Sequence, residues 1–148
     1  MNVEKLIKTS KEIPIKQRSI IHLQMVSNMI TEQINNALKP FDVSLQQFNV
    51  LRILRGQKGK PANLSTISER MVSKMSNTTR LVDKLIKKEY VERQVCASNR
   101  RKVEIRITKN GLAALEEIDK VLLNKENDLT KSFTDEDLKQ LNNLLDKF

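Results

Sequence analysis

Residues 65–108 combine two short helical patterns with two short alternating patterns, and this order limits the folds open to the chain. The spacing predicts one helix that begins near residue 65 and a second helix over residues 74–88. Residues 90–95 and 103–108 then alternate apolar and polar side chains, as the two strands of a hairpin do. We therefore expect a helix-turn-helix followed by a β-hairpin.

Longer helical patterns lie on both sides of this region. Apolar residues recur at helical spacing over residues 14–38, and Ser44 with Gln47 forms a capping box that begins a shorter helix. After the hairpin, Thr108 and then Thr134 are expected to cap two more helices. The 148 residues include only three Gly and three Pro, fewer than the turns of a many-stranded fold need. We expect one mainly α domain (α+β) over residues 1–148.

The helix expected over residues 14–38 carries two apolar rows. A helix on the outside of a small monomer needs only one such row, so part of this helix is expected to pack against another chain. The rows consist of Ile20, Leu23, Ile30, Ile34 and Leu38, and of Ile21, Met25 and Met29.

The positive charge of the chain is concentrated in its middle. The net charge is +9, and residues 45–110 hold sixteen basic and five acidic side chains, whereas residues 111–148 hold five and nine. A protein that binds a membrane surface usually gathers its cations on one face of an amphipathic helix. Here the cations are spread over helix, turn and hairpin patterns, which favours a nucleic acid as the partner.

The hairpin tip, over residues 96–102, carries three consecutive cations. A helix-turn-helix followed by a hairpin with a basic tip is a winged helix. We therefore expect a winged-helix lobe that binds double-stranded DNA over residues 41–109, and a helical dimerisation region over residues 1–40 and 110–148.

Several side chains are candidates for contact with DNA. On the second helix, Ser76, Asn77, Thr79 and Arg80 are predicted to contact base edges and phosphates in the major groove, and Lys74 and Lys84 are predicted to hold phosphates. The alternative is an ordinary solvated helix face. At the hairpin tip, Arg100, Arg101 and Lys102 are predicted to enter the minor groove, and the alternative is a solvated charged turn.

The chain contains, in order, SLQQFNVL at 44–51, TRLVDKL at 79–85, YVER at 90–93, NRR at 99–101 and ITKNG at 107–111. In order and spacing these five segments resemble the MarR (multiple antibiotic resistance regulator) family. The resemblance covers about residues 20 to 145 and implies a homodimeric bacterial transcription regulator that dimerises through its first and last helices. It also implies binding to a pseudo-palindromic operator, often with release when a small molecule binds.

Two positions depart from the family pattern. Asn99 stands where the family usually has Asp, an acid that helps to orient the arginines of the wing and of the second helix. Asn99 can hydrogen-bond an arginine but cannot pair with its charge, so we expect a less rigid wing, with Asn99 still among the DNA-binding residues. Glu89 stands where the family commonly has Gly, so we do not expect a clean left-handed end to the second helix.

A small-molecule pocket is predicted at His22, Met25 and Met29 on the first long helix, between the dimerisation helices and the DNA-binding lobe. The alternative is that His22 is a half-buried helix residue or dimer contact and that both methionines belong to the core. Cys96 lies among arginines that could lower its pKa, and the alternative is an unreactive surface thiol. One Cys and one His do not make an ordinary zinc site, so we expect no metal and no cofactor.

These observations predict a dimeric, sequence-specific transcriptional regulator, most simply a repressor. The start of the chain has no apolar signal segment and no apolar run approaches about 20 residues, so we expect a cytoplasmic protein without a membrane span. An enzyme is disfavoured because no glycine loop or catalytic cluster is present. Two binding functions stay open: a ligand-insensitive architectural DNA-binding protein, and a protein-interaction module, which would not need the cationic tip.

Overall fold

The computed structural model describes residues 2–74, 77–96 and 99–148, and for residues 96 and 99–102 it describes the backbone alone. The elements in chain order are α1 (Val3–Leu6), α2 (Ile15–Leu38), the 3-10 helix η1 (Lys39–Phe41), α3 (Leu45–Arg55), α4 (Leu64–Arg70), α5 (Thr78–Lys87), β1 (Val91–Cys96), β2 (Asn99–Ile107), α6 (Lys109–Thr130) and α7 (Asp135–Leu145).

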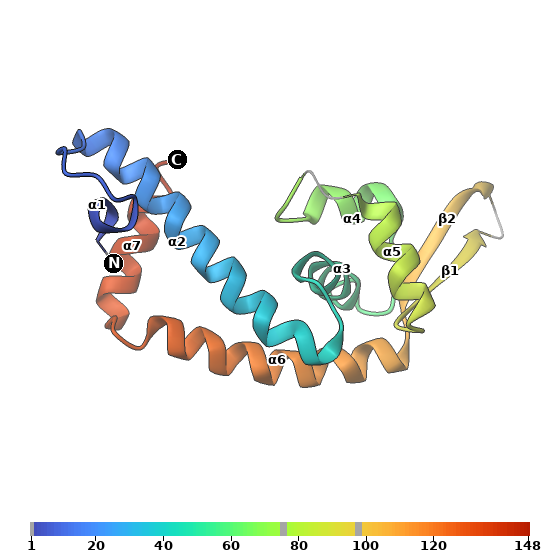
Figure 1. Cartoon of the computed structure of the whole chain (residues 1–148). Helices are drawn as coiled ribbons and strands as arrows, with labels where there is room; N and C mark the ends of the chain where they lie inside the picture. The colour runs from blue at the N-terminus through green and yellow to red at the C-terminus, as the bar shows by residue number, and fades with distance from the viewer. Residues whose placement is uncertain (1, 75–76, 97–98) are drawn as a thin grey trace.

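Two long helices, α2 and α6, connect the two ends of the molecule (Figure 1). At one end, α7 turns back beside α1 and the first turns of α2, and both chain termini lie there. At the other end, α3, α4, α5 and the β1–β2 hairpin form a separate lobe. The mainly α winged-helix architecture expected from the sequence is therefore confirmed.

Side-chain caps begin most of the helices. Ser44 and Gln47 form the expected capping box at α3, and Thr134 forms another at α7. The Thr108 hydroxyl accepts a hydrogen bond from the Gly111 N–H at 3.0 Å and caps α6. All three caps follow from the local sequence because each satisfies N–H groups that the first turn leaves without partners.

The helix-turn-helix begins its helices at other residues than the spacing predicted. The side chain of Asn63 caps α4 by accepting from the Thr66 N–H at 2.7 Å. The side chain of Asn77 caps α5, so this helix begins at Thr78 and not at residue 74. The turn between α4 and α5 is therefore longer than predicted, and Met71 at its start is buried in the core.

The core of the lobe joins the helix-turn-helix, the hairpin and the two long helices. Its fully buried members come from every element of the lobe, from the end of α2 and from the first half of α6. They include Leu38, Val50, Leu51, Ile67, Val82, Leu85, Ile105, Leu115 and Ile118. This shared core holds α5 and the hairpin in one rigid lobe.

The wing is an antiparallel hairpin with Val91 opposite Ile107 and Val95 opposite Val103. At its base, Ile105 exchanges two backbone hydrogen bonds with Ala62, at 2.8 and 2.9 Å, so the segment before α4 forms a third partner of the sheet. Further out, Val95 lies on the same hairpin face as Val91 but is 62% exposed. The outer hairpin therefore extends beyond the core.

The end of α5 corrects the expectation about Glu89. This residue adopts the left-handed conformation, with φ at 59°, although it is not a glycine. The Glu89 N–H donates to the Ile86 carbonyl, and the Tyr90 N–H donates to the Leu85 carbonyl at 3.0 Å. The helix therefore has the clean left-handed end that Gly provides in the family, at the energetic cost of a side chain in that region.

Candidate nucleic-acid interface

The outward face of α5 is polar and basic, and its inward face is apolar. Val82 and Leu85 are fully buried against the lobe, whereas Thr79, Arg80 and Lys84 are exposed on the other side. In the part of the chain that the structure describes, Arg80 and Lys84 form no ion pair. Both charges are thus available to a partner outside the chain.

Asn77 and Lys74 have contacts within the protein that the sequence did not predict. The Asn77 side-chain oxygen accepts from the Arg80 N–H at 3.1 Å, so its first role is the cap of α5. The rest of the Asn77 side chain is exposed to solvent. The Lys74 ammonium donates to the Glu69 carbonyl at the end of α4. Ser76 lies outside the described residues.

The predicted wing residues lie at the start of β2. The backbone of Asn99, Arg100, Arg101 and Lys102 continues the strand into the region predicted as a loop, and Asn99 pairs with Cys96 across a register shift. Their side chains are outside the described part of the structure, so their DNA contacts stay predictions. The position of the strand brings this cationic segment to the outer end of a hairpin that lies beside α5 (Figure 1).

An ion pair connects this hairpin to α5, and the sequence did not predict it. Arg93 on β1 donates from Nη2 to Oδ1 of Asp83 on α5 at 2.7 Å. Arg93 shares a hairpin face with Val91 and Val95, a position where strict alternation would put an apolar residue. That interruption of the apolar pattern was the available sequence signal.

Comparison with known proteins agrees with this geometry. Residues 43–103, which span the helix-turn-helix and most of the wing, match the family model described as the MarR family. This part of the chain is therefore similar to the MarR family.

Two curated proteins are similar to this chain over most or part of its length. It is 28% identical over 127 residues to the multiple antibiotic resistance protein MarR of Escherichia coli, with 84% of this chain and 86% of that protein covered. It is 29% identical over 92 residues to the uncharacterized HTH-type transcriptional regulator YfiV of Bacillus subtilis, a match that spans 62% of this chain and 56% of the relative.

A solved structure also matches the fold of this chain. The crystal structure of a mutant MarR from Escherichia coli, complexed with operator DNA, aligns with a TM-score of 0.75 at 26% identity. The alignment covers 84% of this chain and 89% of that one.

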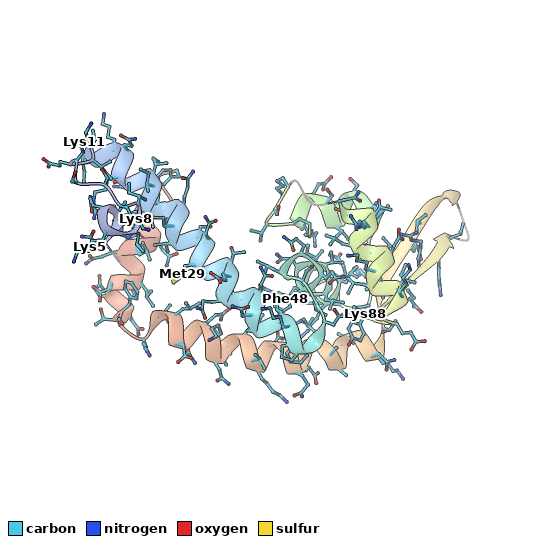
Figure 2. The ribbon with its side chains drawn as sticks, in the orientation of Figure 1. Lys5, Lys8, Lys11, Met29, Phe48 and Lys88 are labelled. Atoms are coloured by element: carbon cyan, nitrogen blue, oxygen red, sulfur yellow. The ribbon has the colours of Figure 1, made fainter. Side chains whose placement is uncertain are left out.

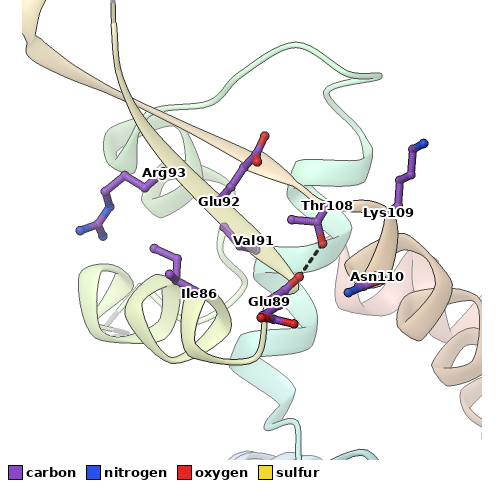
Figure 3. A pocket seen from close by; sticks show the side chains of 8 residues that line it. All are labelled: Ile86, Glu89, Val91, Glu92, Arg93, Thr108, Lys109 and Asn110. Atoms are coloured by element: carbon purple, nitrogen blue, oxygen red, sulfur yellow. Dashed lines mark hydrogen bonds between the residues drawn. The ribbon is translucent and has the colours of Figure 1, made fainter.

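A cavity of about 540 Å³ lies at the base of the wing (Figure 3). The end of α5, the start of β1 and the start of α6 form its walls, and the Thr108 hydroxyl donates to the Glu89 carbonyl at 2.6 Å inside it. Other cavities lie beside α1 and the start of α2.

The predicted pocket residues line none of these cavities. His22, Met25 and Met29 are half-buried on α2, and Met29 lies in the middle of that helix, between its first turns and the lobe (Figure 2). A ligand pocket at these three residues therefore stays a prediction, and in a single chain it has no cavity of its own among those described.

Ion pairs also stabilise the edges of the lobe. Lys88, just after α5, pairs with Asp42, which adopts φ of 50°, and Arg55 on α3 pairs with Asp119 on α6. The Lys88 ammonium lowers the pKa of the Asp42 carboxyl below its ordinary value. These pairs use cations on the sides of the lobe and leave the outward face of α5 positive.

Among the described residues there is neither a candidate metal site nor a candidate membrane span. There, no three His, Cys, Asp or Glu side chains are grouped so that they could hold a metal ion. None of the helices described combines the length and the apolar character that a membrane crossing requires.

Proposed function

We propose that this chain is a cytoplasmic, homodimeric transcriptional regulator that binds a pseudo-palindromic operator and acts as a repressor. The observation that carries the proposal is the outward face of α5, where Arg80 and Lys84 are exposed and form no ion pair among the described residues. It lies beside a hairpin whose tip sequence holds three cations. A helix with this face fits the major groove, and the hairpin then lies over the adjacent minor groove.

Each candidate residue has a role in this proposal. Thr79 and Arg80, at the start of α5, contact base edges, and Lys84 holds a phosphate further along the helix. Lys74, Ser76 and Asn77 precede or cap the helix, where contacts to phosphates are the natural role. Arg100, Arg101 and Lys102, supported by Asn99, contact the minor groove. The similarity to an Escherichia coli MarR structure that contains operator DNA supports duplex DNA as the partner.

Apolar side chains at the other end of the molecule support a homodimer. Ile15 is 73% exposed and Phe148 is 87% exposed, and both belong to the end where α1, α2 and α7 meet. Water contact with so many large apolar groups is unfavourable, and a second copy of the chain would remove it. Other large exposed apolar side chains on or between α1, α2, α6 and α7 are Leu6, Ile20, Leu123, Phe133 and Leu144.

Binding-site selection followed by footprinting tests the proposal. The full chain is mixed with random duplexes of about 30 base pairs, a length of about three helical turns. We expect the selected duplexes to share an inverted repeat whose half-sites are about 10 base pairs apart, or a multiple of that spacing. Uniform protection would instead identify an architectural protein, and no retained DNA would identify an interaction module.

Three accompanying measurements test the finer parts of the proposal. Light scattering in solution should give about twice the chain mass of 17.1 kDa, and a single-chain mass contradicts the dimer. Transcription from a promoter that contains the selected repeat should fall when the protein is added, whereas an increase would identify an activator. Release of the duplex by a small molecule, with His22, Met25 and Met29 as the proposed contacts, is tested by a compound screen with the same duplex.

A further inference from the structure

We infer that the ion pair between Asp83 and Arg93 positions the wing relative to α5 and so acts as a positioning pair for DNA binding. The inference rests on the proposed function, because it assigns a role within that binding surface. It adds two residues to the candidate set, and neither of them needs to contact DNA.

The hairpin register explains why Arg93 can reach α5. Arg93 lies opposite Ile105, and the pairs on either side of it are Val91 with Ile107 and Val95 with Val103. All six side chains therefore share one face of the hairpin. Figure 3 shows the Arg93 side chain on the same side of β1 as Ile86 of α5. Arg93 is therefore the polar residue in an otherwise apolar contact between the hairpin and α5.

The hairpin is held firmly at its base and loosely further out. Val91 is 2% exposed and Ile105 is fully buried, and Ile105 is also hydrogen-bonded to Ala62. Two residues beyond Arg93, Val95 is already 62% exposed. Within the described residues, the Asp83–Arg93 pair is therefore the outermost polar contact between α5 and the wing.

A small rotation at this point becomes a larger displacement at the cations. The last residue of β1 lies three residues beyond Arg93, a distance of about 10 Å along a strand, and the cationic segment begins after it. Without the pair, the wing can change its angle to α5 while its buried base stays packed. The two parts of the surface would then no longer match the major and minor grooves together.

The pair contributes little to folding, so its effect can be measured separately. The Arg93 and Asp83 side chains are 33% and 47% exposed, and pairs with this exposure contribute little to stability. Asp83→Asn keeps the shape of the side chain and should leave the urea midpoint of unfolding unchanged. A positioning role therefore predicts a change in DNA affinity without a change in stability.

The sign of the change in DNA affinity distinguishes a positioning role from a purely electrostatic effect. Asp83→Asn removes a negative charge from a surface that faces a polyanion, so electrostatics alone predicts tighter binding to DNA. Positioning predicts weaker binding, because the wing cations lose their alignment. Glu92, also exposed and on the neighbouring strand position, forms no ion pair in the described structure, so Glu92→Gln is the matched control for the loss of one carboxylate.

The experiment measures affinity for a duplex that the wild-type chain has selected from the random library. We expect Asp83→Asn to weaken binding by about tenfold, the effect of one misplaced charge-assisted contact. The slope of log K against log salt should also become shallower, by about 0.9 for each phosphate that the wing no longer reaches. Glu92→Gln should leave the affinity unchanged or slightly higher.

A double-mutant cycle then tests whether the effect acts through the wing. In a chain with Arg100, Arg101 and Lys102 each changed to Ala, Asp83→Asn should have no further effect, because the cations that it positions are gone. An affinity for Asp83→Asn equal to or above wild type would overturn the inference, and so would the same tenfold loss in the wing-tip background. A wild-type chain that selects no duplex would overturn the proposed function instead.

Discussion

Replacement of Gly111 by Ala tests the closest backbone approach among the three glycines. A Cβ atom at this position would lie 2.1 Å from the Tyr90 carbonyl oxygen and 2.8 Å from Cγ1 of Ile107. Ordinary contacts between such atoms are about 3.5 Å, so α6 and the start of β1 would have to separate by more than about 1 Å. The same Tyr90 oxygen accepts a hydrogen bond from the Thr108 N–H at 3.0 Å, and the separation would strain or break it.

The expected magnitude follows from opposing contributions. Ala is favoured over Gly inside a helix by about 1 kcal/mol, which on its own predicts stabilisation. Overpacking a rigid contact destabilises by about 1–3 kcal/mol, and the broken hydrogen bond by about 1 kcal/mol. The net prediction is a decrease of about 1–3 kcal/mol in the free energy of unfolding, opposite in sign to the helix propensity.

Urea unfolding followed by circular dichroism measures this change. We expect the midpoint to fall by about 1 M, since the dependence on urea is about 1–3 kcal/mol per M for a domain of this size. Asn110→Ala, one residue earlier on the exposed surface, is the control and should change the midpoint little. A Gly111→Ala midpoint equal to or above that of the wild type would refute the argument from the close contact.

Three other predictions test single residues. Arg101→Ala should weaken binding to the selected duplex and reduce the slope of log K against log salt by about 0.9, and an unchanged slope would exclude its phosphate contact. Glu89→Gly should raise the free energy of unfolding by about 1 kcal/mol, because glycine adopts φ of 59° without strain. Glu89→Ala keeps Cβ and should not raise the free energy of unfolding. Equal effects of the two substitutions would contradict this reason. Because Lys88 lowers the pKa of Asp42, that pair adds stability above the unfolded pKa of about 3.9, and the contribution is lost as pH falls through the lower folded value. Asp42→Asn should therefore flatten the acid limb of a plot of urea midpoint against pH, and an unchanged limb would rule out this contribution.

The helix boundaries show where local sequence was sufficient. Ser44, Thr108 and Thr134 were predicted as caps and act as caps, because a cap needs only N–H groups within three residues. At α5 the spacing predicted a start at residue 74, whereas the side chain of Asn77 caps the helix and α5 begins at Thr78. This boundary was not predicted from the local sequence.

The candidate interface also combines features that the sequence predicts with features that depend on the tertiary structure. The polar face of α5 could be predicted from helical spacing, and Thr79, Arg80 and Lys84 are indeed exposed together. The contact between Asp83 and Arg93 could not be predicted, because it depends on how far the hairpin lies from α5. Spacing along the chain carries no information about the distance between two packed elements.

The sequence by itself determined the order of elements, most of the helix starts and the concentration of positive charge in residues 45–110, because these depend on hydrogen bonds and side-chain periodicities within a few residues. Only the tertiary structure decided that Glu89 ends α5 in the left-handed region, that Ala62 pairs with Ile105, and that Arg93 meets Asp83. Each of these features joins segments that are separated in sequence or are forced into place by a shared core. Their geometry follows from packing and not from local preference.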